Sequence, residues 1–253
     1  MTKKVILFAH IPKTAGSSLR DIGMKNCERS LTLHVAHDRS GKGISEQIKQ
    51  FNQLSAESPI DGQTIVLGHF GFSMHEYLGQ SDFQYITMLR DPVDRVVSHF
   101  YHLKSTAHPG VSGLSLIEFA RSNRFEVILD NMQTRFLSNY GWHCYNPYYM
   151  PLFEFSASNQ TKITACDDDM FLCAKNNLLN NTLFGLQEEM ADSLSLFSSC
   201  LGWEANEVKL NQRKVNPDEE PELMSDAINI IRARNKYDLG LYELAQKTFR
   251  NQI

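Results

Sequence analysis

The 253-residue sequence predicts an α/β fold, in which a central, mainly parallel sheet is flanked by helices and the C-terminal half is helical. Two observations lead to this class. Short apolar runs alternate with helical patterns over the first hundred residues, as they do where helices connect parallel strands. Beyond them, apolar residues recur with helical spacing. The sequence shows no internal repeat and no low-complexity linker, so we expect one domain over residues 1–253.

Composition sets the broad class of protein. Hydrophobic residues make up 42% and charged residues 21% of the chain, which is ordinary for a globular protein and excludes a disordered or collagen-like one. The longest apolar runs are far shorter than the about 20 residues of a spanning helix, so no membrane span is expected. The five cysteines form no CxxC pair or zinc-spaced cluster; we expect reduced thiols in the cytoplasm and no metal site. No basic stripe interleaved with aromatics indicates a nucleic-acid partner.

Five short runs are the expected strands. They are apolar, most contain β-branched residues, and polar or turn residues border them. They lie at Lys4–Ala9, Leu31–Ala36, Thr64–Gly68, Tyr85–Leu89 and Thr182–Leu186.

The expected helices follow from the spacing of apolar residues. Ser17–Cys27 and Ile44–Leu54 lie between the first three strands. Two further apolar stripes in the second half of the chain have helical spacing. The first consists of Met190, Leu194, Phe197 and Leu201, and the second of Leu223, Met224, Ala227, Ile228 and Ile231.

The segment His10–Leu19 joins the first expected strand to a helix and has the residues of an anion site. Gly16 allows the backbone to approach a ligand closely, and the N–H groups and dipole of the following helix attract phosphate or sulfate. Hydroxyl donors and a positive charge come from Thr14, Ser17, Ser18 and Lys13. The alternative is an ordinary strand–turn–helix junction that Ser17 caps.

This loop differs from the phosphate loop of nucleotide triphosphatases, which requires Gly, four residues, Gly and then Lys-Ser/Thr. Here Lys13 precedes Gly16, and the loop is shorter. The later Gly41-Lys42-Gly43 lacks the first glycine and the hydroxyl residue, and we expect it to form a surface turn.

A second polar motif begins where the strand Tyr85–Leu89 ends. Asp91 is a good helix N-cap and Pro92 a good first helical residue, so a helix is expected to begin there. Arg90 then lies at the carboxyl end of a strand, where open α/β sheets bind ligands. Its guanidinium suits a phosphate dianion. The alternative is an ion pair between Arg90 and a carboxylate.

The spacing along this helix separates an apolar face from a polar one. The apolar face consists of Val93, Val96, Val97 and Phe100. The polar stripe consists of Asp91, Arg95, Ser98 and His102. Ser98 is therefore expected on the exposed side, where it either joins Arg90 as a phosphate ligand or is merely solvated.

His10–Leu19 closely resembles the 5′-phosphosulfate loop of sulfotransferases that use 3′-phosphoadenosine 5′-phosphosulfate (PAPS). It looks most like the carbohydrate group with the heparan-sulfate 2-O- and 6-O-sulfotransferases and their bacterial relatives. The stretch from Arg90 to Ser98 resembles the 3′-phosphate motif of the same enzymes. The resemblance implies a P-loop-like three-layer fold, with Arg90 and Ser98 on the 3′-phosphate of PAPS. It assigns the 5′-phosphosulfate to Lys13, Thr14, Ala15, Gly16, Ser17 and Ser18.

Transfer of a sulfuryl group to a hydroxyl needs a base for the proton and fixed positive charge for the leaving group. We expect Lys13 to supply the charge. Gly68-His69 follows an apolar strand and resembles the segment that carries the catalytic histidine in the 2-O- and 6-O-sulfotransferases, so we expect His69 to be the base. The rival histidines are His10, His75, His99 and His102. His10 lies inside the segment His10–Leu19, which we call the phosphate loop, and a cation there would help to bind the donor.

Three later segments carry weaker signals. Asn131–Leu137 resembles a helix segment of these enzymes, and its Arg135 is assigned either to substrate or to a structural pair. Leu210–Pro217 resembles a late basic loop that folds over the nucleotide. Its Arg213 and Lys214 accordingly either touch the 3′-phosphate or lie on plain surface. A third segment contains the aromatic residues Tyr148, Tyr149 and Phe153. They belong either to an acceptor groove or to the core.

The residues and the resemblance together predict a PAPS-dependent sulfotransferase that acts on a hydroxyl of a carbohydrate or glycoconjugate, releases adenosine 3′,5′-bisphosphate (PAP) and needs no metal. Two alternatives stay open. One is a P-loop kinase, which would hold ATP with Mg²⁺ through carboxylates; the other is a non-catalytic nucleotide-binding protein on the same fold. We expect neither the membrane anchor nor the disulfides of Golgi relatives, and the sequence lacks dense basic clusters for a long polyanionic glycan. Heparan sulfate is therefore not assumed to be the acceptor.

Overall fold

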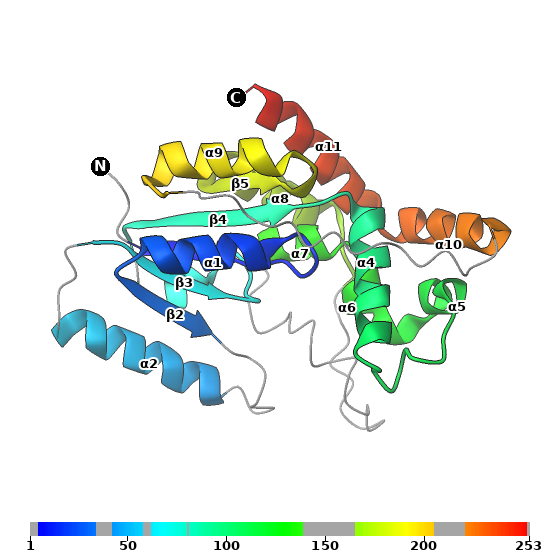
Figure 1. Cartoon of the computed structure of the whole chain (residues 1–253), viewed down its shortest axis with the longest axis horizontal. Helices are drawn as coiled ribbons and strands as arrows, with labels where there is room; N and C mark the ends of the chain where they lie inside the picture. The colour runs from blue at the N-terminus through cyan, green and yellow to red at the C-terminus, as the bar shows by residue number, and fades with distance from the viewer. Residues whose placement is uncertain are drawn as a thin grey trace.

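A computed structural model describes residues 5–33, 42–57, 62–79, 81–138, 165–204 and 221–251. Its centre is a five-stranded sheet in the order β2-β3-β1-β4-β5, with every neighbouring pair parallel (Figure 1). The strands are β1 Val5–Ala9, β2 Arg29–Leu33, β3 Thr64–Gly68, β4 Phe83–Leu89 and β5 Thr182–Leu186. The predicted parallel α/β fold is confirmed.

Strand β1 lies at the centre of the sheet, with β3 on one side and β4 on the other. In the register, Leu7 stands opposite Val66 of β3 and Tyr85 of β4. Because all strands run in the same direction, their carboxyl ends meet at one edge of the sheet, where open α/β folds bind ligands. The segments that follow β1, β3 and β4 carry both phosphate motifs and His69, so the topology brings these motifs to one edge.

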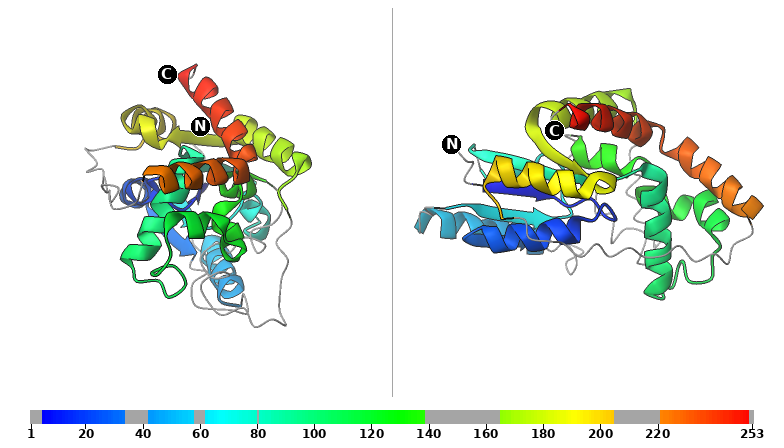
Figure 2. Two further views of the ribbon diagram at one scale, coloured as in Figure 1. Left: turned by 90° about the vertical axis from the view of Figure 1, so that its right-hand side faces the viewer. Right: turned by 45° about the horizontal axis from the view of Figure 1, so that its top comes forward.

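Helices cover both faces of the sheet (Figure 2). They are α1 Gly16–Asn26, α2 Lys42–Glu57, α3 Met74–Tyr77 and α9 Met190–Leu201. Alternate side chains of β1 point to opposite faces: Ile6 and Phe8 pack in an apolar cluster with α1 and α9, whereas Leu7 packs in a second cluster with α2 and α3. The result is the three-layer arrangement that the resemblance implied, with the phosphate loop after the central strand.

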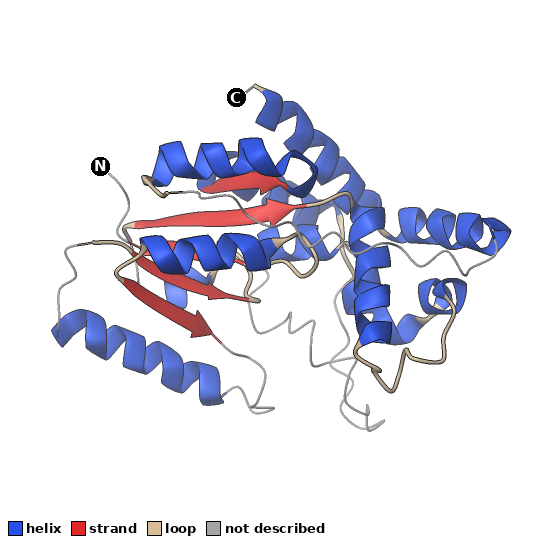
Figure 3. Cartoon of the chain, in the orientation of Figure 1, coloured by secondary structure: helices blue, strands red, loops and turns tan. Residues whose placement is uncertain are grey.

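Most of the other helices gather beyond the carboxyl ends of the strands, toward which the strand arrows point (Figure 3). Over the described ranges, the other helices are α4 Pro92–Ser105, α5 Leu116–Arg121, α6 Glu126–Leu129, α7 Met132–Leu137, α8 Asp168–Asn181, α10 Pro221–Arg234 and α11 Lys236–Arg250, and 3₁₀ turns lie at Asn123–Phe125 and Gln187–Glu189. A third apolar cluster lies between these helices. Of these, α8 and α11 share this apolar cluster with β5. The expected helical C-terminal half is confirmed. In the described part of the chain, no helix has the length and apolar character needed to cross a membrane.

Two local expectations are wrong. The spacing along α4 puts Arg95 on a polar stripe together with Ser98, which is expected on the exposed side, but the structure buries Arg95 completely. Its Nη2 donates to the carbonyl of Ile128 (2.6 Å) and its Nη1 to Sδ of Met132 (3.2 Å), because α6 and α7 cover this side of the helix. Periodicity shows one apolar stripe and cannot show that a helix is packed on a second, polar side. Lys42 begins α2 rather than lying in a surface turn.

Helices α7 and α11 cap each other with buried polar side chains. Asp238 of α11 accepts hydrogen bonds from the N–H groups of Gln133 (3.0 Å) and Thr134 (2.7 Å), and from the Thr134 hydroxyl (2.8 Å). In return, Asn131 accepts from the N–H groups of Tyr237 (2.9 Å) and Asp238 (3.1 Å). Asn131 has a left-handed backbone (φ 50°), which asparagine tolerates better than most residues. The two helix starts are thereby fixed to one another.

We expect Asp238→Ala to lower the free energy of unfolding by about 2–4 kcal/mol, because three buried donors lose a charged acceptor. Denaturant titration followed by circular dichroism measures this change. Glu243→Ala on the same helix is the control, since Glu243 pairs with Lys247 at the surface, and its midpoint should barely move. Equal midpoints for the two variants would show that the Asp238 contacts contribute nothing to stability.

Candidate active site

The loop between β1 and α1 is shaped to expose backbone N–H groups. Lys13 (φ 72°) and Ala15 (φ 63°) both have left-handed backbones. Left-handed residues in alternation with ordinary ones turn successive N–H groups toward one point and so form a concavity that binds anions. Ala15 is the N-cap of α1, and no side chain caps the helix. The alternative in which Ser17 caps this junction is therefore wrong. The Ser18 N–H donates to the Ala15 carbonyl (3.1 Å), so Gly16 and Ser17 are the residues of the first turn whose N–H groups suit an anion.

The hydroxyl groups of the loop are not equivalent. Thr14 is completely buried, and its Oγ1 donates to the carbonyl of Ile11 (2.9 Å). The Thr14 hydroxyl thus stabilises the loop, and the group of Thr14 that remains as a donor to an anion is its backbone N–H. Ser17 is exposed and Ser18 half-buried. Their predicted contacts with the donor stay predictions.

His10 packs against the loop from inside. Its ring stacks on Phe8 with centroids 5.3 Å apart. A Cβ atom at Gly16 would collide with Cδ2 of His10, so this ring leaves no room for a side chain at position 16. Burial, and then nearby positive charge at His69, Arg20 and Lys13, lowers the pKa of His10 to about 3. Burial thus favours the neutral form of the ring over the cation that would help to bind the donor.

His69 lies in the segment that follows β3, next to the phosphate loop. Its Nδ1 donates to the main-chain carbonyl of His10 (2.6 Å), since a carbonyl oxygen only accepts. This bond places the proton of the neutral ring on Nδ1 and leaves the basic lone pair on Nε2. The ring centroids of His69 and His10 lie 4.7 Å apart. The geometry therefore suits His69 for the role of proton acceptor beside the loop.

The other candidate histidines have different surroundings. His75 stacks on Phe83 (centroids 4.3 Å apart), and its Nδ1 lies 3.1 Å from the Tyr85 hydroxyl, at the sheet face that α3 covers. His99 is buried in α4, where burial lowers its pKa well below the ordinary value. His102 is half-buried and lies one turn further along the same helix. His75 lies in α3, and His99 and His102 lie in α4, so all three are further along the chain from a strand end than His69, which directly follows β3.

Arg90 brings the two phosphate motifs together. Its Nη1 donates to the main-chain carbonyl of Lys13 (3.2 Å), across the adjacent strands β1 and β4. Its Nε is buried and has no hydrogen-bond partner among the described residues. Within the same described ranges, no carboxylate forms an ion pair with Arg90, so the carboxylate alternative finds no support there. The guanidinium therefore borders the phosphate loop and keeps a buried donor.

The start of α4 confirms the predicted cap. The Asp91 carboxylate accepts from the N–H groups of Val93 (2.9 Å) and Asp94 (3.0 Å), with proline at the first helical position. The N–H of Asp91 itself donates to Glu188 (3.1 Å), just after β5. Ser98 lies two turns into α4 and is half-buried. Its contact with the 3′-phosphate stays a prediction.

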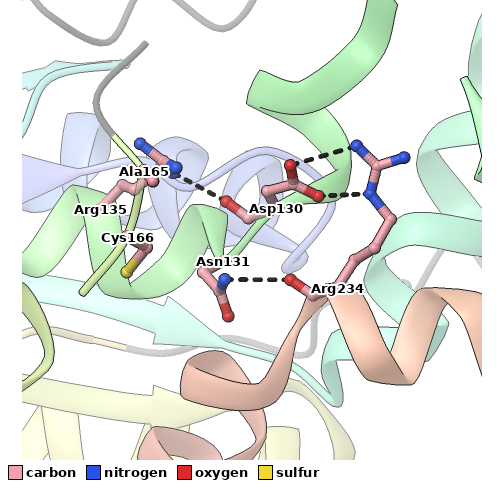
Figure 4. Close-up of a pocket in the computed structure, with 6 residues that line it drawn as sticks. All are labelled: Asp130, Asn131, Arg135, Ala165, Cys166 and Arg234. Atoms are coloured by element: carbon pink, nitrogen blue, oxygen red, sulfur yellow. Dashed lines mark hydrogen bonds and ion pairs between the residues drawn. The ribbon is translucent and has the colours of Figure 1, made fainter. Parts of the chain in front are cut away.

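Arg135 serves the fold through its Nε, which donates to the carbonyl of Asp130 (2.8 Å). It lines a polar cavity of about 220 Å³ together with Cys166 and the ion pair between Arg234 and Asp130 (Figure 4). This contact supports the structural assignment of Arg135. Some residues singled out from the sequence lie outside the described part of the chain. They are the predicted nucleotide contacts Arg213 and Lys214 and the aromatic group of Tyr148, Tyr149 and Phe153.

The sequence did not reveal the role of Gln133, which contacts the Arg90 main chain. The N–H of Arg90 donates to Oε1 of Gln133 (3.0 Å), and Nε2 of Gln133 donates to the Arg90 carbonyl (2.9 Å). One feature of the sequence could have pointed to this role, namely three successive polar residues in a short expected helix segment. Gln133, Thr134 and Arg135 are all buried, and buried polar residues need partners.

Comparison with known proteins identifies the family of the chain. A family model described as "Sulfotransferase family" matches residues 1–243 of the chain. The chain belongs to the sulfotransferase family. Sequence relatives include heparan-sulfate 6-O-sulfotransferase 3 of Homo sapiens and of Mus musculus, each 28% identical over an alignment of 196 residues that covers 68% of this sulfotransferase chain.

The matched region is a part of those relatives, since the chain spans 39% of their length. Among solved structures, a crystal structure of mouse sulfotransferase SULT7A1 complexed with PAP is similar with a TM-score of 0.41 and 13% sequence identity. That similarity covers 92% of this chain and 65% of the other. Within the described residues, no group of three or more His, Cys, Asp or Glu side chains is placed to hold a metal ion.

We expect Gly16→Ala to lower the melting temperature and to weaken the binding of PAP, because its methyl group must displace the His10 ring. Overpacking of this kind costs about 1–3 kcal/mol. Gly113→Ala is the control, because the structure leaves open space around that position. Differential scanning fluorimetry with and without PAP measures both effects. A Gly16→Ala protein that matches Gly113→Ala would show that the His10 ring can move without cost.

Proposed function

We propose that this protein transfers the sulfuryl group of PAPS to a hydroxyl group of a carbohydrate or glycoconjugate. The observation that carries the proposal is the hydrogen bond between Arg90 and the Lys13 carbonyl. It joins the loop that resembles a 5′-phosphosulfate site to the motif that resembles a 3′-phosphate site. A ligand with phosphate groups at both ends of a ribose fits such a pair of sites.

The 5′-phosphosulfate would lie over the start of α1. There the N–H groups of Gly16 and Ser17, assisted by Ala15 and Thr14 in the loop, would bind its oxygens. Ser18 would contribute its hydroxyl, because its N–H donates to the Ala15 carbonyl (3.1 Å). Lys13 would neutralise the charge that develops on the leaving phosphate oxygen. Arg90 and Ser98 would hold the 3′-phosphate. By resemblance alone, Arg213 and Lys214 would also contact the 3′-phosphate.

His69 would act as the base in the proposed reaction. The acceptor oxygen attacks sulfur while the bond between sulfur and the bridging phosphate oxygen breaks, so PAP leaves with both electrons of that bond. The acceptor proton passes to Nε2 of His69. The hydrogen bond from Nδ1 to the His10 carbonyl supports this role, because it selects the tautomer in which Nε2 accepts.

A carbohydrate acceptor is supported by the names of the relatives, which act on heparan sulfate at a 6-O position. We propose a single sulfotransferase domain with a hydroxyl-bearing small molecule or glycan as its substrate. We also propose the cytoplasm as its compartment. None of the four described cysteines forms a disulfide, and burial raises the pKa of Cys27 and Cys166 to about 12, which makes these thiols slow to react.

The donor site is tested by ligand-induced stabilisation. We expect PAP to raise the melting temperature without added metal and ADP to do so less, because ADP lacks the 3′-phosphate. At about 100 times its dissociation constant, a ligand adds about 2.7 kcal/mol to the free energy of unfolding, which is easily seen in a thermal shift. Stabilisation by ATP that requires Mg²⁺, with none by PAP, would favour the kinase alternative instead.

The base is tested by His69→Asn, whose amide nitrogen can replace Nδ1 as the donor to the His10 carbonyl. We expect near-normal PAP affinity and a loss of turnover of about 10²–10⁴-fold. The wild-type rate should rise with pH, because only the neutral imidazole accepts a proton. PAP release, measured on a panel of sugar and phenol acceptors, reports the turnover and its dependence on pH. Titration with PAP reports the affinity.

Two further variants separate the roles around the base. Lys13→Ala should lose donor affinity as well as turnover, and His75→Ala, outside the site, should keep both. A fully active His69→Asn enzyme would assign the base elsewhere. PAP binding without turnover on any acceptor in the panel would favour the non-catalytic alternative.

A further inference from the structure

The main chain of Arg90 is held by a side chain rather than by a neighbouring strand. Pairing between β4 and β5 ends at Leu89, which lies opposite Leu186. At the next residue, the carboxamide of Gln133 binds the Arg90 N–H with its oxygen and the Arg90 carbonyl with its nitrogen, at 3.0 and 2.9 Å. The opposite orientation of the amide would set donor against donor, so these contacts decide its orientation. One side chain thus satisfies both main-chain groups of the residue.

Gln133 is itself fixed by burial and by a hydrogen bond of its main chain. It is 1% exposed and lies in the first turn of α7, where its own N–H donates to the buried Asp238 (3.0 Å). At the other end of this helix, the carbonyl of Phe136 accepts from the N–H of Phe72 (2.9 Å), in the segment that follows His69. Helix α7 therefore contacts both the Arg90 main chain and the segment that carries the base.

The direction of the Arg90 side chain depends on this main-chain contact. Its guanidinium reaches the Lys13 carbonyl at 3.2 Å, and its Nε points into buried space with no partner among the described residues. A planar guanidinium binds phosphate with strict geometry, so a small rotation of the Arg90 main chain misaligns its donors. Loss of one positioning contact then affects the ligand group that Arg90 binds more than the rest of the ligand.

We propose that Gln133 is a positioning residue for the 3′-phosphate, because its carboxamide holds the Arg90 main chain and so aims the guanidinium. The inference rests on the proposed function, in which Arg90 binds the 3′-phosphate of the donor. Gln133 needs no contact with the nucleotide in this role. Its removal should therefore act through Arg90 and on the 3′-phosphate alone.

The test compares PAP with adenosine 5′-monophosphate (AMP), which lacks the 3′-phosphate, by isothermal titration calorimetry. Gln133→Met keeps the volume and neutrality of the side chain but removes both hydrogen bonds. We expect it to weaken PAP about tenfold and AMP less than about twofold, a loss that corresponds to one charge-assisted hydrogen bond. In the Arg90→Ala background the same substitution should have little further effect on PAP, because the group that it positions is absent.

Gln133→Asn is the second variant, in case Gln133→Met does not fold, and it should weaken PAP selectively to a smaller extent because its amide is too short by one methylene. Asn177→Ala is the matched control. Asn177 is also buried, and its amide donates to the Leu137 carbonyl (2.8 Å) at the opposite end of α7, so its loss should not change the ratio of PAP to AMP affinity.

The outcomes separate the inference from the proposed function. If the wild-type protein prefers PAP to AMP and Arg90→Ala removes that preference, but the Gln133 variants keep it, the positioning role is wrong and the proposed function stands. Equal weakening of PAP and AMP, or full additivity with Arg90→Ala, also overturns the inference. A wild-type protein without any preference for PAP overturns both.

Discussion

The parallel pairing of β1 with β3 and with β4 is the constraint on which the rest of the structure depends. Parallel strands place their carboxyl ends at one edge, so the three segments that leave this edge become neighbours although they are far apart in sequence. Two main-chain carbonyls then join these segments: that of His10 accepts from His69, and that of Lys13 accepts from Arg90. The phosphate loop is thus the common partner of the base and of the second phosphate motif.

Packing from the inside shapes the phosphate loop as much as any ligand would. The His10 ring fills the space beside Gly16, and the Thr14 hydroxyl is bonded to the Ile11 carbonyl. These contacts support left-handed backbones at Lys13 and Ala15, which L-amino acids adopt at a cost. The strain is concentrated where backbone N–H groups must point outward, and this is a common arrangement at anion sites.

The helical half of the chain supports the site from a distance through buried polar contacts. Asp238 and Asn131 fix the starts of α7 and α11 to each other, and Gln133 extends this network to Arg90. Buried polar groups carry a desolvation cost that only full pairing offsets, so such a network specifies one arrangement more sharply than apolar packing does. Arg95, which donates to the Ile128 carbonyl, belongs to the same polar layer beneath α4.

The sequence by itself determined the parallel α/β fold, the carboxyl ends of β1, β3, β4 and β5, and the residues of the two phosphate motifs, because apolar periodicity and helix caps such as Asp91 are local properties of the chain. The second strand was expected at Leu31–Ala36, whereas β2 is Arg29–Leu33. Only the tertiary structure decided which polar residues are buried. Arg95 lies on the polar stripe of its own helix but is completely buried, burial lowers the pKa of His10, and Gln133 contacts a residue far from it in sequence. The physical reason is that burial, and with it charge state and hydrogen-bond partner, depends on neighbours from other elements, whereas spacing along one element records only its own apolar face.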